Sequence, residues 1–242
     1  IELNNNYPEA YSNLGNILKE QNKFKKAEYF LRNGMRVVGL ARDHNKFIWK
    51  GGDYIPITVE LSDSSKLTDL VKEVLKNHPS ISTFVSNAGY GDFKSLENFS
   101  VSQIERFINV NLLSHIILSR ALITHMKSKG EGNIFLMGSE ASLTGKKKAT
   151  LYSAAKFGLR GFAQSLKEEA GGSGVRVCLI NPGMVRTPFF DKLTFEPAEA
   201  FNNAIEPEDI AKIIFDLQSV RLGTIVEEIN LFPSKKSINF KK

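Results

Sequence analysis

The feature that most constrains the fold is a regular alternation of short apolar runs with longer amphipathic segments. The runs have the length and composition of buried strands, and the segments between them have the apolar spacing of helices. The predicted strands are residues 35–41, 54–60, 81–85, 133–137, 175–180 and 225–232. The predicted helices are centred on 67–75, span 101–129 and 152–169, and begin at Glu206-Pro207. This alternation predicts an α/β fold, in which helices cover both faces of a parallel sheet and the crossovers are right-handed.

Composition narrows the class of protein further. The 242 residues, 42% of them hydrophobic, suffice for a full core. The net charge of +6 comes from basic residues spread along the chain, without a basic face, so we predict no nucleic-acid partner. No apolar run approaches the ~18 residues of a membrane span, and we predict no membrane partner. A single cysteine, Cys178, allows no internal disulfide, which predicts a cytoplasmic protein. We expect no metal site.

Tyr152 and Lys156 lie four residues apart in a predicted helix, which places an ammonium beside a phenol. A free phenol has a pKa of about 10, and a neighbouring cation lowers it toward the range useful for proton transfer. Ser139, thirteen residues before the tyrosine, adds a second hydroxyl. Together these groups predict protonation of a carbonyl oxygen. The alternative is a surface tyrosine and lysine on an amphipathic helix, and the surrounding motifs decide against it.

Four further motifs follow one another in a fixed order. They are Ser86-Asn87-Ala88-Gly89, Asn109-Val110-Asn111, Phe135-Leu136-Met137-Gly138-Ser139, and Asn181-Pro182-Gly183 followed by Thr187. With Tyr152 and Lys156, they resemble the short-chain dehydrogenase/reductase family over about residues 27–234. The resemblance implies a Rossmann-type doubly wound parallel sheet and an oxidoreductase that interconverts a carbonyl and a secondary alcohol as its small-molecule substrates.

The resemblance also implies the catalytic roles. Tyr152 is the general acid for reduction and the general base for oxidation. Lys156 lowers the pKa of that tyrosine and contacts the nicotinamide ribose. Ser139 holds the substrate oxygen, and Asn111 supports a proton-relay water. Taken singly, Ser139 is better explained as a strand-end serine and Asn111 as a helix-bend asparagine, whereas the two together favour the catalytic roles.

The implied cofactor is NADP(H), because Arg42 rather than an acidic residue follows the predicted strand 35–41. A guanidinium pairs bidentately with a 2′-phosphate, which a carboxylate would repel. A solvated arginine at a strand end is the alternative. The other cofactor-binding residues implied by the family are Glu60, Leu61, Asn87, Ala88, Gly89, Tyr152, Lys156, Pro182, Gly183 and Thr187.

The start of the chain departs from the family pattern. The family begins with a strand and a TGxxxGIG turn, whose backbone N–H groups hold the cofactor pyrophosphate. Here no glycine lies between Gly15 and Gly34. We therefore expect that the first strand and the turn are missing and that cofactor binding is impaired. We also expect marginal stability, since two strands would lose a neighbour.

Residues 1–26 instead resemble a tetratricopeptide (TPR) repeat. Tyr11, Leu14-Gly15, Leu18 and Ala27 occupy positions of that repeat. We expect a helical TPR-like segment, 1–26, before a dehydrogenase domain, 27–242, with residues lost upstream or a repeat joined to the domain. An arbitrary helical hairpin is the alternative.

Two kinds of protein partner are expected from these resemblances. One binds through the TPR-like segment, and the other is a second copy that pairs through helices 101–129 and 152–169. The alternative function is a catalytically silent chimera that serves as an interaction module.

Overall fold

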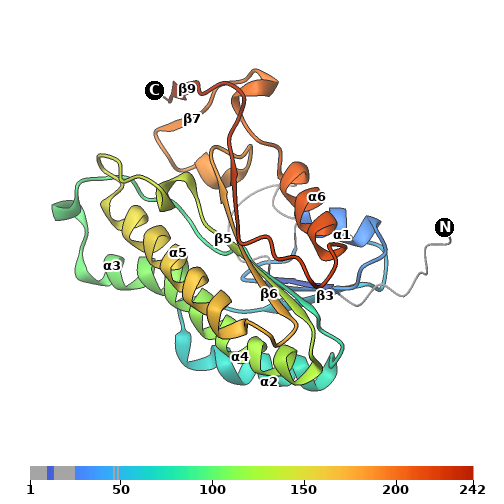
Figure 1. Cartoon of the computed structure of the whole chain (residues 1–242). Coiled ribbons are helices and arrows are strands. Elements are labelled where there is room, and N and C mark those ends of the chain that lie inside the picture. The colour runs from blue at the N-terminus through green and yellow to red at the C-terminus, as the bar shows by residue number, and fades with distance from the viewer. Residues whose placement is uncertain (1–9, 14–24, 46, 48, 242) are drawn as a thin grey trace.

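The computed structural model describes residues 10–13, 25–45, 47 and 49–241, and for 10–13 the backbone alone. Its centre is a parallel sheet (Figure 1). The strands lie in the order β1 (Ala10–Asn13), β4 (Thr83–Ser86), β5 (Gly132–Met137), β6 (Val175–Pro182) and β8 (Glu228–Leu231). β2 (Val37–Ala41) and β3 (Tyr54–Thr58) form a second parallel pair, with β2 against β1. The predicted Rossmann-type α/β class is confirmed.

Strand β1 corrects the expectation that the first strand is missing. It pairs in parallel with β4, from Ala10 opposite Thr83 to Asn13 opposite Ser86. Ladder hydrogen bonds join backbone N–H and C=O groups, so a segment without a strand-like apolar pattern can still fill the position. β2 and β4 therefore have a neighbour between them, so neither strand lacks the partner whose loss would make the protein marginally stable.

The TPR-like segment overlaps this strand. Tyr11, one of its matching positions, lies in β1 rather than in a helix. Residues 1–9 and 14–24, which include the place of the family's glycine turn, lie outside the described residues. α1 (Lys25–Arg32) then begins just before the expected boundary at residue 26. A TPR-like repeat in the rest of residues 1–26 stays a prediction. The division of the chain into segments 1–26 and 27–242 also stays a prediction.

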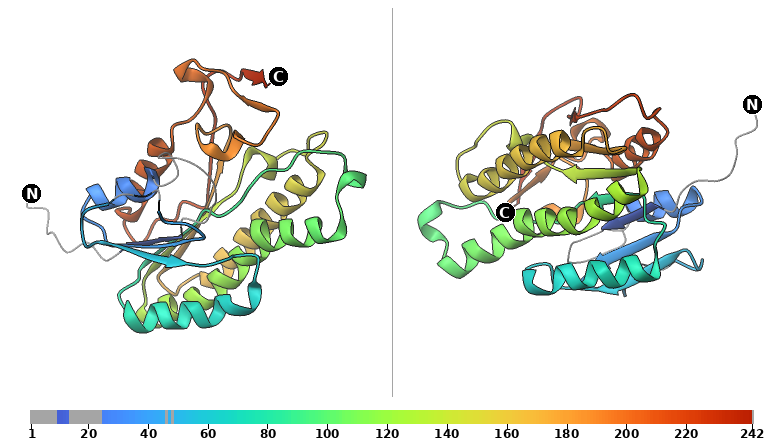
Figure 2. Two further views of the ribbon diagram at one scale, coloured as in Figure 1. Left: turned by 180° about the vertical axis from the view of Figure 1, so that it is seen from behind. Right: turned by 60° about the horizontal axis from the view of Figure 1, so that its bottom comes forward.

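Helices cover both faces of the sheet (Figure 2). α1 and α6 (Pro207–Gln218) pack together on one face, where Phe30, Ile180 and Ile214 are among the buried side chains. α2 (Leu67–Asn77), α4 (Ser114–Lys129) and α5 (Thr150–Ala170) cover the other face. Amphipathic spacing decides these orientations, because residues three and four apart share one face of a helix.

The predicted helix 101–129 is interrupted once. α3 (Val101–Ile108) starts with a capping box, in which Ser100 Oγ accepts from the Gln103 N–H and Gln103 Oε1 accepts from the Ser100 N–H. A π-helical turn, Asn109–Leu113, then leads into α4. π turns occur frequently at functional sites. This one buries Asn111 completely.

In the described part of the chain, Val101–Lys129 is the one helical stretch that is long and apolar enough to cross a membrane. Half of the window that meets this test is buried inside the fold, where α4 packs against α2, α5 and the sheet. Half of this apolar window therefore belongs to the protein core.

Short elements complete the carboxyl-terminal part. β7 (Phe195–Pro197) pairs antiparallel with β9 (Ile238–Phe240). Single turns of 3₁₀-helix lie at Ser64–Lys66, Leu96–Asn98, Glu140–Ser142, Pro188–Phe190 and Phe201–Asn203. Two of them, Glu140–Ser142 and Pro188–Phe190, follow β5 and β6 and border the site described below.

Two glycines in the turn between α5 and β6 have the same backbone conformation but different surroundings, so substituting each one tests the packing of this turn. Gly172 and Gly174 both have left-handed backbone, with φ of 74° and 79°. A Cβ on Gly172 would meet nothing within 4 Å, whereas a Cβ on Gly174 would lie 1.8 Å from the Gly130 carbonyl oxygen. We expect Gly172→Ala to lower the free energy of unfolding by about 1–2 kcal/mol, the cost of left-handed backbone. Gly174→Ala should lower it by at least about 2 kcal/mol more, because the backbone must move. Chemical denaturation measures both, and equal losses would contradict the packing argument.

Candidate active site

The carboxyl ends of three parallel strands bring the predicted site residues to one edge of the sheet. Asn87, Ala88 and Gly89 follow β4, Ser139 follows β5, and Pro182 ends β6. The other groups come from helices: Tyr152 and Lys156 from α5, and Asn111 from the π turn. In open α/β sheets this edge is where ligands bind.

Asn111 and Lys156 meet around Gly89. A Cβ built on Gly89 would lie 2.8 Å from Asn111 Oδ1 and 3.7 Å from Lys156 Nζ. Asn111 Oδ1 accepts a hydrogen bond from the Tyr90 N–H at 3.0 Å. Lys156 Nζ donates to the Met137 carbonyl at 2.8 Å. A side chain at position 89 would displace Asn111, so the glycine is required by this close approach.

Tyr152 is 7% exposed, and its ring is surrounded by Phe93, Phe107 and Phe189 at centroid distances of 5.3, 6.4 and 6.0 Å. Burial raises the pKa of Tyr152 to about 12, while a hydrogen bond with the Ser139 side chain opposes that rise. Tyr152 is therefore protonated at neutral pH, as a proton donor must be.

The lowering of the Tyr152 pKa by Lys156 stays a prediction. The ammonium lies 5.9 Å from the centroid of the Tyr152 ring and donates to the Met137 carbonyl. Burial lowers the pKa of Lys156 itself to about 8, which weakens it as a source of fixed positive charge. The group that lowers the pKa of the phenol in this structure is Ser139.

Ser139 is held by hydrogen bonds at the end of β5. Its N–H donates to Ser142 Oγ at 3.1 Å and to Asn181 Oδ1 at 3.3 Å, and its hydroxyl accepts from the Ala141 N–H at 3.2 Å. Asn181 is fully buried and donates in turn to Glu228 Oε1 at 2.9 Å. Asn181 thus orients the serine, a role that the sequence reading missed although Asn181 begins one of the quoted motifs.

His115, one helical turn after Asn111, fixes the backbone of segment 87–89. Its Nε2 lies 2.8 Å from the Ala88 carbonyl oxygen and its Nδ1 lies 2.7 Å from Ser86 Oγ. Because a carbonyl only accepts, Nε2 carries the hydrogen and Nδ1 accepts from the serine. Burial, with the charge of Lys156, lowers the pKa of His115 to about 3, so the ring is neutral. The sequence reading missed this pair, although serine in place of the family's asparagine at position 86 was a signal.

Lys26 of α1 faces the same segment from the opposite side. It is 9% exposed, and its Nζ donates to Asn87 Oδ1 at 2.8 Å. Burial lowers the pKa of Lys26 to about 8, and the charge of Lys26 contributes to the lowered pKa of Lys156. Sequence reasoning missed Lys26 as well. The sequence did contain an indication of this role, because Lys26 lies four residues before Phe30 and so on the buried face of the helix.

Arg42 and Glu60 lie together beyond the ends of β2 and β3. Arg42 Nη1 is 3.1 Å from Glu60 Oε2, and the same oxygen accepts from Arg106 Nη2 at 3.1 Å. Arg42 keeps 30% of its side chain exposed. Leu61 follows with its side chain buried in the core. Arg42, Glu60 and Leu61 thus lie together in the structure. Arg106, which was not predicted, lies beside them and pairs with Glu60.

The segment after β6 is anchored by its backbone. The Gly183 N–H donates to the Leu231 carbonyl at 2.7 Å, which ties Pro182-Gly183 to β8. Thr187 Oγ1 accepts from the Phe189 N–H at 3.4 Å and so begins the turn Pro188–Phe190. That turn carries Phe189 to the ring of Tyr152.

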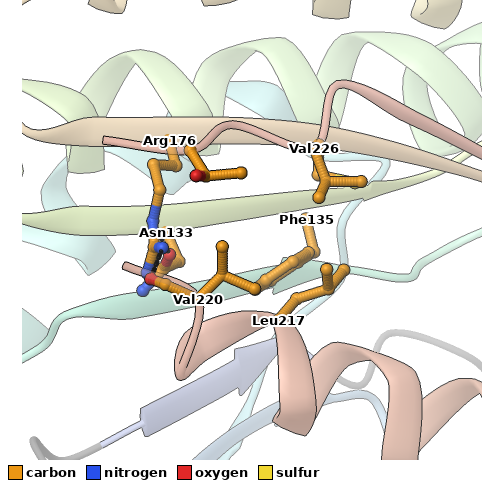
Figure 3. A pocket seen from close by; sticks show the side chains of 8 residues that line it. Asn133, Phe135, Arg176, Leu217, Val220 and Val226 are labelled. Carbon is orange, nitrogen blue, oxygen red and sulfur yellow. Dashed lines mark hydrogen bonds between the residues drawn. The ribbon is translucent and has the colours of Figure 1, made fainter. Parts of the chain in front are cut away.

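A small cavity lies at the opposite, amino-terminal end of β5 and β6 (Figure 3). Its lining residues are Asn133, Phe135, Arg176, Cys178, Leu217, Val220, Thr224 and Val226. Arg176 donates to Asn133 Oδ1 at 2.9 Å and to the carbonyls of Gln218 and Val220. The guanidinium therefore holds the loop after α6, and none of the predicted site residues lines this cavity.

Comparison with known proteins shows the family of this chain. The family model described as short chain dehydrogenase matches residues 24–197, more than half of the chain. The protein belongs to the short-chain dehydrogenase/reductase family, whose members among its relatives are oxidoreductases.

Individual relatives match over most of their length. Sepiapterin reductase from Chlorobaculum tepidum is 30% identical over 182 residues, which cover 75% of this chain and 73% of the relative. A 3-oxoacyl-(acyl-carrier-protein) reductase, FabG, from Buchnera aphidicola subsp. Acyrthosiphon pisum is 30% identical over 210 residues, 82% of this chain and 86% of the relative. The crystal structure of a metagenomic short-chain oxidoreductase in complex with NADP superposes with a TM-score of 0.78 at 26% identity, covering 95% of this chain and 98% of that one.

The two buried lysines predict how stability depends on pH. Lys26 and Lys156 each have a pKa of about 8 in the folded protein against an ordinary value of 10.5. Between these values the folded state has released protons that the unfolded state still binds, so the free energy of unfolding should rise as pH increases from about 8 to about 10. Denaturant unfolding across this range measures the slope, and Lys26→Met should reduce it. A flat or falling profile in the parent would show that these lysines are not buried as described.

Proposed function

We propose that this protein is an NADP(H)-dependent oxidoreductase that interconverts a carbonyl and a secondary alcohol. One observation carries the proposal: Asn111 from the π turn, Ser139 after β5, and Tyr152 with Lys156 from α5 converge at the carboxyl edge of the sheet. A protonated phenol within hydrogen-bonding reach of a serine hydroxyl suits the protonation of a carbonyl oxygen.

Each of the four side chains has a role that follows from its place. The Ser139 hydroxyl orients the substrate oxygen, and the Tyr152 hydroxyl donates its proton to that oxygen as hydride reaches the carbonyl carbon. The nicotinamide, when bound, supplies or accepts the hydride. Lys156 lies next to Gly89 and Asn111, where its ammonium can return a proton to Tyr152 through a relay water that Asn111 supports. In the direction of oxidation Tyr152 accepts the proton instead.

The residues at the edge fit a phosphorylated dinucleotide. Segment 87–89 follows β4 at this edge, and Arg42 keeps 30% of its side chain exposed just after β2. Glu60 pairs with both Arg42 and Arg106, so a 2′-phosphate there would face two guanidinium groups at the cost of competing with one carboxylate. The metagenomic relative bound to NADP supports this choice of cofactor.

Aromatic side chains suggest the character of the substrate. Phe93 contacts the rings of Tyr152 and Phe195, with centroids 5.3 and 5.4 Å apart, and Phe189 lies 6.0 Å from Tyr152. A carbonyl that reaches the Tyr152 hydroxyl therefore meets phenyl rings on its other side. We infer a substrate whose carbonyl is flanked by apolar groups.

A catalytically silent interaction module is the second candidate. The glycine-free stretch between Gly15 and Gly34 favours it, because that stretch stands where the family holds the pyrophosphate. The silent-module hypothesis expected the first strand to be missing, but that strand is present as β1. The catalytic groups also lie together at the sheet edge. These observations favour the enzyme. A partner bound through residues 1–26, pairing of two chains and a cytoplasmic location stay predictions.

Removal of the phenolic hydroxyl tests the catalytic assignment. Tyr152→Phe should lower any carbonyl reduction by about 100-fold or more, the scale expected for loss of a general acid. Tyr29→Phe is the matched control, because Tyr29 packs on Phe215 in the α1 and α6 layer, away from the site. Steady-state rates with NADPH over a panel of ketones provide the measurement. Activity within a few-fold of the parent in Tyr152→Phe would remove Tyr152 from the mechanism.

Replacement of Arg42 tests the choice of cofactor. Charge-assisted hydrogen bonds contribute about 1.5–3 kcal/mol, so Arg42→Ala should reduce the preference for NADPH over NADH by about tenfold to a hundredfold. Glu60→Gln should act in the opposite direction, since it removes the carboxylate that competes for the guanidinium. Binding titrations with both dinucleotides give the ratio. An equal loss of NADPH and NADH affinity in Arg42→Ala would assign Arg42 a structural role instead.

A further inference from the structure

The segment that follows β8 returns to the site through its pairing with β7. β9 runs antiparallel to β7, and Phe195 of β7 lies opposite Phe240 (Figure 1). The ring of Phe195 is 5.4 Å from that of Phe93, which contacts the ring of Tyr152. The segment after β8 therefore borders the aromatic surroundings of the proton donor. Lys236 lies in this segment, between β8 and β9.

Lys236 joins the segment to the end of β5. Its Nζ lies 2.7 Å from Glu140 Oε2, across 96 positions of sequence. Glu140 directly follows Ser139 and begins the turn Glu140–Ser142, which packs against α5. The ammonium thus contacts the carboxylate that is next in sequence to the serine proposed to orient the substrate oxygen.

This ion pair is open to solvent, with 63% of the Lys236 side chain and 36% of the Glu140 side chain exposed. Exposed ion pairs contribute little to stability, because water and salt screen them and two long side chains must be ordered. The main effect of the pair is therefore on the charge near the site rather than on the free energy of unfolding.

An uncompensated carboxylate at Glu140 would oppose carbonyl reduction in two ways. Burial raises the pKa of Tyr152, and the charge of Glu140 raises it further, which makes the phenol a weaker acid. The substrate oxygen also gains negative charge as hydride arrives, and a nearby anion disfavours that charge. Lys236 places a positive charge 2.7 Å from the carboxylate and so opposes its field at the site.

We propose that Lys236 is a positioning residue of the reaction that acts through Glu140: it neutralises the carboxylate beside Ser139, so that the substrate oxygen meets no uncompensated negative charge. The inference rests on the proposed carbonyl reduction. The alternative is that Lys236 only anchors its segment, through Glu140 and through the Phe232 ring, whose centroid lies 4.6 Å from its Nζ. The two roles differ in one respect, because removal of the opposite charge repairs a lost charge but does not repair a lost anchor.

A double-mutant cycle in steady-state carbonyl reduction separates these roles. Lys236→Met should lower kcat by about threefold to tenfold, the effect of one uncompensated charge near the reacting atoms, and leave the Kd of NADPH unchanged. Addition of Glu140→Gln should restore kcat to within about twofold of the parent, since both charges are then absent. Lys236→Arg should retain kcat because it keeps the positive charge.

Lys235→Met is the matched control. It removes the same net charge from the neighbouring exposed residue, which is held through its backbone N–H to the Asn202 carbonyl. Its kcat should equal that of the parent. Thermal melting monitors folding, and Lys236→Met should melt within about 4 °C of the parent because the pair is exposed.

Failure of Glu140→Gln to restore kcat in the Lys236→Met background would assign Lys236 an anchoring role, and the proposal would fall. A larger drop in melting temperature that the double variant shares would have the same meaning. Unchanged kcat in Lys236→Met would also overturn the proposal, while leaving the oxidoreductase function intact. A parent protein that reduces no carbonyl with NADPH would instead overturn the proposed function together with this inference.

Discussion

The parallel pairing of β4, β5 and β6 determines where the reactive groups of this protein lie. Since the ladders run in one direction, the segments after all three strands begin at the same edge. The hydrogen bond from Lys156 to the Met137 carbonyl then fastens α5 to the last residue of β5. Through it, Tyr152 keeps a fixed relation to Ser139. The His115 contact with Ala88 does the same for the segment after β4. The site is therefore a product of sheet geometry and three or four buried polar contacts.

Burial explains the protonation states at this edge better than neighbouring charges do. Desolvation keeps Tyr152 protonated and His115 neutral, and it disfavours the charged forms of Lys26 and Lys156. A spacing of four residues on a helix brings two side chains near one another, but it does not determine which atom the ammonium contacts. Here the Met137 carbonyl competes successfully for it. The edge is consequently a protonated donor beside two cations, an arrangement that suits an anionic cofactor.

The sequence predicted the helices and strands whose apolar residues recur at a regular spacing, and it predicted the site residues that belong to family motifs. It predicted the strands at 133–137 and 175–180, the helix around Tyr152 and the α/β class. These were predictable because a strand or helix that packs in the core must place apolar residues at the spacing of its buried face. β1 was missed, since backbone pairing leaves little trace in side-chain composition. Lys26, His115 and Asn181 were missed because their importance lies in contacts across 61, 27 and 42 positions of sequence. Such contacts are decided by tertiary packing.

The π-helical turn at Asn109–Leu113 limits how the chain can vary in length. One residue more or less in an α-helix rotates everything beyond it by about 100°. The wide turn absorbs one extra residue, so that Asn111 turns inward while Leu118 of α4 still faces the core. A single deletion here would convert the wide turn to ordinary α-helix, so α4 would keep its face toward the sheet while Asn111 lost its inward position. The length of this stretch is thus tied to the position of Asn111 in the site.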